Sequence, residues 1–238
     1  MERKIRFPTK GSRMLRRTFP SLLLLALAVP VGAQNVVLDE GTFRLLNGRR
    51  DVGTETFTIR RIGQGADAHV IANAVLELDL PIGHQQVKPL LQTGTDLGVT
   101  AYQVGVSGAN PVDVRVELNG RRFLTATRTP AGEQEREFRA APGSVLLEEG
   151  VAHQYWFLSK LAEGTHVSVL VPRSGTQYDV AVRSVRPESI RIAGATVDAR
   201  HVTIEVDGKM HEVWYDADGR VLKVNVPSTG FAAERTSR

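Results

Sequence analysis

The residue best placed to do chemistry is His211, because the strand pattern turns its side chain toward an apolar face. A two-residue turn at Asp207-Gly208 would pair Ile204 with His211 and Val202 with Val213. An imidazole titrates near neutral pH and can act as an acid, a base or a ligand contact. The sequence leaves two interpretations of His211: a hydrogen-bonded histidine of the core or its rim, or a ligand-binding or catalytic group.

A second ionisable residue, Glu55, also falls on an apolar face. Phe57 and Ile59 have the opposite strand parity from Val52, and Gly53 between them predicts a β-bulge or bend. That shift places Glu55 on the face of Phe57 and Ile59. A carboxylate there costs several kcal/mol unless it is paired. Glu55 is therefore expected to pair with an arginine, to lie at the sheet rim or to bind a ligand.

Three consecutive aromatic residues, Tyr155, Trp156 and Phe157, lie in the segment that most resembles a helix. Residues 151–162 follow two glutamates, which favour the positive end of a helix dipole, and Gly164 is placed to end the helix. The apolar arc of this helix is wider than one core contact needs. The aromatic residues are expected either to fill the core or to cover a ligand groove.

Other catalytic and metal-binding patterns are missing from the sequence. The chain has no cysteine, which excludes disulfides, thiolate metal sites and thiol catalysis. Residues 105–108 lack the final spacing of a serine hydrolase elbow, and no HExxH motif or glycine-rich phosphate loop occurs. The loop at 216–219 resembles the start of a calcium loop but lacks the later glutamate ligand. We expect no metal and no cofactor, and the missing motifs favour a non-catalytic protein.

Strands must position these side chains, because apolar residues alternate along most of the chain. The alternation is clearest at 70–80, 102–106, 112–118, 167–171, 178–182 and 202–206. Asn-Gly or Asp-Gly pairs beginning at 47, 119, 207 and 218 are typical of tight hairpins. The sequence predicts a mainly β protein, built as a single strongly curved, half-barrel-like antiparallel sheet of about 11–12 strands with one main helix.

The register of the last hairpin follows from side-chain parity. A four-residue loop at 216–219 would place Leu222 opposite Val213 and Val224 opposite His211. A loop one residue shorter would put a lysine on the core face, so parity favours the longer loop.

The first 33 residues have the three parts of a secretory signal peptide. Arg16-Arg17 precede an apolar run at 22–29, and small residues lead to Ala33. We expect cleavage after Ala33, which leaves 34–238 as a single β-rich domain.

The predicted signal peptide also indicates where the mature protein is located. The apolar run is shorter than the ~20 residues that a membrane span needs, and no cysteine is present for lipid attachment. We expect a soluble periplasmic or extracellular protein without a transmembrane span in the mature chain. Translation from Met14 instead of Met1 would give a shorter leader, and the sequence fits either start.

The net charge of +4 belongs to the leader. Seven of the 30 basic residues and one of the 26 acidic residues precede the predicted cleavage site, which leaves a net charge of −2. Basic residues in the mature chain cluster only as pairs beside turns, such as Arg49-Arg50. A nucleic-acid partner would need a basic stripe, so we expect none.

The order of elements resembles that of exported bacterial proteins of unknown function. The residues that carry the resemblance are the leader, a first hairpin at 41–57, the mid-chain helix and a closing hairpin at 213–222. Those proteins are similar in architecture to the periplasmic lipoprotein-carrier family, in which a curved half-barrel holds an acyl chain under helices. The resemblance implies a lipid or acyl chain as the ligand.

Three functions fit these observations. The first is a non-catalytic exported envelope protein that binds an apolar or amphipathic ligand on the concave face of the sheet. Its candidate ligand contacts are Tyr155, Trp156, Phe157, His211 and Glu55. The second is a structural or interaction protein of the cell envelope. The third is an enzyme with an unrecognised site near Glu55 and His211.

Overall fold

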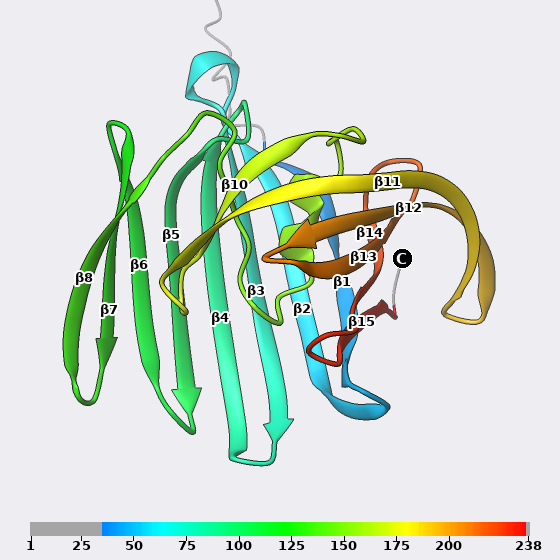
Figure 1. The fold of residues 1–238 in the computed structure, drawn as a ribbon, viewed down its shortest axis with the longest axis horizontal. Coiled ribbons are helices and arrows are strands. Elements are labelled where there is room, and N and C mark those ends of the chain that lie inside the picture. Colours follow the sequence, from blue (N-terminus) through cyan, green and yellow to red (C-terminus); the bar gives the residue numbers. More distant parts are fainter. Residues whose placement is uncertain (1–34, 237–238) are drawn as a thin grey trace, which may run out of the picture. The chain divides into compact units, whose positions relative to one another are not determined.

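The computed structural model describes residues 35–236, which are mostly strands (Figure 1). The signal peptide predicted at residues 1–33 lies outside the described residues. The first eight strands are β1 (Asn35–Asn47), β2 (Arg50–Ile62), β3 (His69–Leu80), β4 (Gly83–Gly94), β5 (Val99–Gly108), β6 (Val112–Asn119), β7 (Arg122–Thr129) and β8 (Gly132–Arg139). The others are β9 (Val145–Leu146), β10 (His166–Val171), β11 (Thr176–Ile192), β12 (Ala195–Val206), β13 (Lys209–Tyr215), β14 (Val221–Val226) and β15 (Phe231–Arg235).

All fifteen strands belong to one sheet, in the order β8-β7-β6-β5-β4-β3-β2-β1-β15-β14-β13-β12-β11-β10-β9. Neighbours are antiparallel except β9 and β10, which pair in parallel. The first and last strands, β1 and β15, pair in the middle of the sheet, with Phe43 opposite Arg235. The sheet is strongly curved and unclosed (Figure 1). This confirms the predicted mainly β, half-barrel-like fold, with fifteen strands in place of 11–12.

The core follows from the alternation along the strands. In β3, for example, Val70, Ala72, Ala74 and Leu76 are all buried. Burial of a Val or Leu side chain stabilises the fold by about 1.5–3 kcal/mol relative to exposure. Most buried side chains join one cluster on one face of the sheet.

A glycine bulge turns Glu55 into this core, as the sequence predicts. The register of β1 and β2 shifts between Leu45 and Leu46, and Gly53 has a φ of 143°. A Cβ at Gly53 would lie 1.8 Å from the carbonyl oxygen of Glu77, so only glycine fits. Glu55 is consequently fully buried opposite Phe43.

The two C-terminal hairpins differ in how well the sequence predicts them. The β12–β13 pairing has the predicted register, with Ile204 opposite His211. The predicted β13–β14 register is wrong, because a shift between Trp214 and Tyr215 pairs Val224 with Val213. The shift also turns Leu222 away from the main core, into a small cluster with Trp214.

The predicted helix at 151–162 is wrong in type and length. The segment forms a short 3-10 helix, η2 (His153–Leu158); a second, η1 (Gly65–Asp67), lies between β2 and β3. Five of the six residues of η2 are buried, so packing on several sides outweighs the one-face pattern of an α-helix. In the part of the chain that the structure describes, no helix is long and apolar enough to cross a membrane.

Candidate functional site

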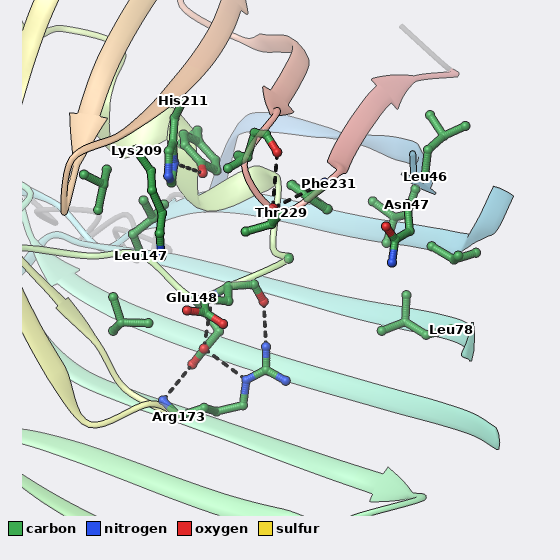
Figure 2. Close-up of a pocket in the computed structure, with 18 of the residues that line it drawn as sticks. Leu46, Asn47, Leu78, Leu147, Glu148, Arg173, Lys209, His211, Thr229 and Phe231 are labelled. Carbon is green, nitrogen blue, oxygen red and sulfur yellow. Dashed lines mark hydrogen bonds and ion pairs between the residues drawn. The ribbon is translucent and has the colours of Figure 1, made fainter. Parts of the chain in front are cut away.

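A pocket of about 430 Å³ lies on the core side of the sheet, where the ends of several hairpins meet (Figure 2). Its apolar lining consists of Leu45, Leu46, Val52, Leu78, Leu80, Leu147, Val171, Val206, Val226 and Phe231. Its polar lining consists of Asn47, Gln85, Glu148, Glu149, Tyr155, Arg173, Tyr178, Asp207, Lys209, His211 and Thr229. The pocket therefore offers an apolar wall together with ionisable groups.

Two of the predicted site residues, Tyr155 and His211, meet at this pocket. The Tyr155 hydroxyl lies 2.7 Å from His211 Nδ1, although 56 residues separate them in the chain. Tyr155 is fixed further by its carbonyl oxygen, which accepts a hydrogen bond of 2.8 Å from the Tyr215 hydroxyl. The pair thus joins the 3-10 helix to β13.

Burial keeps both members of this pair neutral. It raises the pKa of Tyr155, and the nearby Glu149 carboxylate raises it further. Burial also lowers the pKa of His211 to about 4, with a smaller contribution from the Lys209 ammonium. At neutral pH the pocket therefore presents an uncharged imidazole.

We expect the free energy of unfolding to fall as His211 becomes protonated in the unfolded chain. Its pKa is about 4 in the folded protein, against 6.5 ordinarily. Between these values the unfolded chain binds a proton that the folded protein does not. Stability is full above about pH 6.5 and decreases toward pH 4, by about 2–3 kcal/mol from this residue. Urea denaturation should show this loss in the wild type and a smaller one in His211→Gln; equal losses would contradict the assignment.

An ion pair between the half-buried Arg173 and the buried Glu148 forms the opposite side of the pocket (Figure 2). Arg173 Nε lies 3.0 Å from Glu148 Oε1, and the Arg173 backbone N–H donates to Glu148 Oε2 at 3.3 Å. The guanidinium also donates to the Glu149 carbonyl oxygen at 2.6 Å. Burial raises the pKa of Glu148, and the charge of Arg173 opposes that rise. This cluster ties the 147–150 segment to the β10–β11 turn.

Glu55 does not line the pocket; it anchors the start of the 3-10 helix. Its carboxylate accepts hydrogen bonds from the backbone N–H groups of Ala152 at 2.7 Å and His153 at 2.8 Å. The His153 ring nitrogen Nδ1 lies 2.6 Å from the same carboxylate. The partners are therefore a histidine and two amides, whereas the sequence left open an arginine partner, a position at the rim or a bound ligand. Glu55 is absent from the lining of the pocket that His211 lines, so this pocket is not an active site built from both.

The other two aromatic candidates also lie away from the pocket lining. Phe157 is buried, and Trp156 is half-buried against it, with ring centroids 5.2 Å apart at an interplanar angle of 83°. These contacts are those of core packing. Of the five candidates, the structure brings Tyr155 and His211 together at the pocket.

Sequence reasoning missed Lys209, Glu148 and Arg173. Lys209 could have been found, because it lies two residues from His211 and shares its strand face. No sequence signal pairs Glu148 with Arg173, since only the folded sheet brings the two segments together.

Comparisons with known proteins place the chain in a family. A family model described as a domain of unknown function, DUF6134, matches residues 112–237, more than half of the chain. No curated protein matches. The crystal structure of a beta-barrel-like protein of domain of unknown function DUF1849 from Brucella abortus matches with a TM-score of 0.46 and 10% identity, covering 82% of this chain and 93% of that chain. By the family match, the chain belongs to the DUF6134 family of domains of unknown function.

Proposed function

We propose that this protein is a non-catalytic, exported protein of the cell envelope that binds an apolar or amphipathic molecule. The observation that supports this most is the pocket of about 430 Å³ on the core side of the sheet. Pockets for small molecules fall between roughly 300 and 1,000 Å³, and most are apolar with a few polar groups. The leucine-rich wall beside Tyr155, His211 and Lys209 has that character.

The apolar wall sets the expected energetics of binding. Each methylene group removed from water contributes about 0.8 kcal/mol. A chain that lies along Leu45, Leu78 and Leu80 would therefore gain affinity with each added carbon until the pocket is full.

The test is a calorimetric titration with straight-chain alcohols of eight to fourteen carbons, below their aggregation limits. We expect affinity to rise about tenfold for every two added carbons, since two methylenes contribute about 1.6 kcal/mol. Leu80→Arg should abolish binding because it places a charge in the apolar wall. Leu118→Arg is the matched control, since Leu118 is exposed and does not line the pocket. Equal binding by both variants, or no binding by the wild type, would refute the proposal.

Export is tested separately from binding. The protein produced with its leader in a Gram-negative host should be recovered from the periplasm or medium. Sequencing of its mature N-terminus should read Gln34-Asn35-Val36, because cleavage is expected after Ala33. Recovery of the intact leader in that fraction would contradict the export proposal and leave the binding proposal unaffected.

A further inference from the structure

Two hydrogen-bond donors lie side by side at the pocket. Lys209 and His211 are alternate residues of β13, so their side chains leave the same face of the strand. Both line the pocket, and Figure 2 shows them together on one strand, across from Glu148 and Arg173. The positive charge of Lys209 also contributes to the lowered pKa of His211.

The hydrogen bond with Tyr155 decides which nitrogen of His211 carries the proton. The Tyr155 hydroxyl is buried, and its partner is His211 Nδ1 at 2.7 Å. If Nδ1 carried the proton, the buried hydroxyl hydrogen would have no acceptor among residues 35–236, which is costly. The hydroxyl therefore donates to Nδ1, and the proton of the neutral ring lies on Nε2.

With the proton on Nε2, the Nε2–H group of His211 can donate a hydrogen bond to a bound molecule. No hydrogen bond joins Nε2 of His211 to any other group within residues 35–236, and Nε2 is not among the buried unpaired atoms of that range. A fixed N–H donor next to an ammonium favours an acceptor that carries negative charge.

The acidic residues of the pocket limit how many negative charges the head group of the ligand can carry. Glu148 is paired with Arg173, so it does not compete for Lys209. Asp207 lies 4.0 Å from the Lys209 ammonium, and Glu149 is exposed at the rim. Asp207 already forms an ion pair with Lys209, so Asp207 and Glu149 would repel a head group with two or more negative charges more strongly than one with a single charge. Among anionic head groups, the lining therefore favours a compact one with a single negative charge.

We propose that the pocket binds a single-chain amphiphile by its carboxylate, with the carboxylate between His211 Nε2–H and the Lys209 ammonium and the hydrocarbon chain along the apolar wall. This rests on the proposed function. A volume of about 430 Å³ lies toward the small end of small-molecule pockets, which favours one chain over the two chains of a phospholipid.

Four probes with the same twelve-carbon chain test the head group. They are dodecanoate, dodecanol, dodecylammonium and dodecyl phosphate, titrated calorimetrically at low salt and slightly alkaline pH, where the carboxylate is ionised. Dodecanoate should bind at least about tenfold more tightly than the other three, as expected for a charge-assisted hydrogen bond. Comparison of dodecyl phosphate with dodecanoate shows whether the pocket prefers a phosphate or a carboxylate head group.

Lys209→Met is the decisive variant, because it keeps most of the length of the side chain and removes the charge. It should weaken dodecanoate binding at least about tenfold and leave dodecanol binding unchanged. Lys88→Met is the matched control, since Lys88 is exposed on β4 and does not line the pocket. Near-native melting of both variants excludes unfolding as the cause.

The outcomes separate this inference from the proposed function. Equal binding of dodecanoate and dodecanol, with no effect of Lys209→Met, would overturn the head-group assignment while apolar binding stands. Tighter binding of dodecylammonium would overturn it and point to Glu149 and Asp207, and tighter binding of dodecyl phosphate would overturn the choice of carboxylate. No binding of any probe would refute the proposed function itself.

Discussion

Replacement of Glu55 by glutamine is expected to lower the free energy of unfolding by about 1–3 kcal/mol, the usual cost of leaving a buried hydrogen-bond donor without its acceptor. The wild-type carboxylate accepts hydrogen bonds from the backbone N–H groups of Ala152 and His153 and pairs with His153 Nδ1. An amide presents donors where one of these groups needs an acceptor, so a buried N–H loses its partner. The start of the 3-10 helix should loosen as a result.

Urea denaturation, followed by circular dichroism, measures this loss. Glu135→Gln is the matched control, because Glu135 is exposed on the outer strand β8, and it should change stability by less than about 0.5 kcal/mol. If Glu55→Gln fell within about 1 kcal/mol of the wild type, Glu55 would not be the anchor of the helix.

A larger loss, about 3–5 kcal/mol, is expected for Arg235→Met, which breaks a buried pair of opposite charges. The Arg235 side chain is 3% exposed and donates two hydrogen bonds to the Asp39 carboxylate, at 2.6 and 3.2 Å. It also donates to the Val221 carbonyl oxygen and lies 5.4 Å from the ring centroid of Phe57. Methionine fills much of the space but leaves the Asp39 charge buried without its cation.

A double-mutant cycle distinguishes the lost pair from lost packing. Asp39→Leu combined with Arg235→Met removes both charges, so the double variant should be more stable than Arg235→Met alone. Denaturation of the four proteins in urea gives the coupling energy. Additive losses would show that the Asp39–Arg235 pair is not the source of the effect.

The parts of the fold that the sequence predicts correctly are those fixed by local geometry. Asp207-Gly208 sets the register of β12 and β13, because a tight turn leaves only one pairing. Gly53 and the parity change beside it indicate the bulge in β2. The shift at Trp214 has no comparable marker, which is why the predicted β13–β14 register is wrong.

The candidate site is only partly readable from the sequence, because its contacts join distant segments. Strand parity correctly turns His211 and Glu55 inward. It carries no information about their partners, since Tyr155 and His153 reach them across 56 and 98 residues. The apolar arc at 151–162 has the spacing of an α-helix, yet burial on several sides produces a 3-10 helix.

The pairing of the first strand with the last has a consequence for the order of folding. Strands β2 to β8 are linked by short connections between sequence neighbours, so those contacts can form early. The contact of Phe43 with Arg235 closes a loop of nearly the whole described chain, which carries a large entropic cost until other strands are in place. One edge of β1 therefore stays open until β15 has been synthesised. A chain that completes its sheet this late stays only partly folded for as long as synthesis continues.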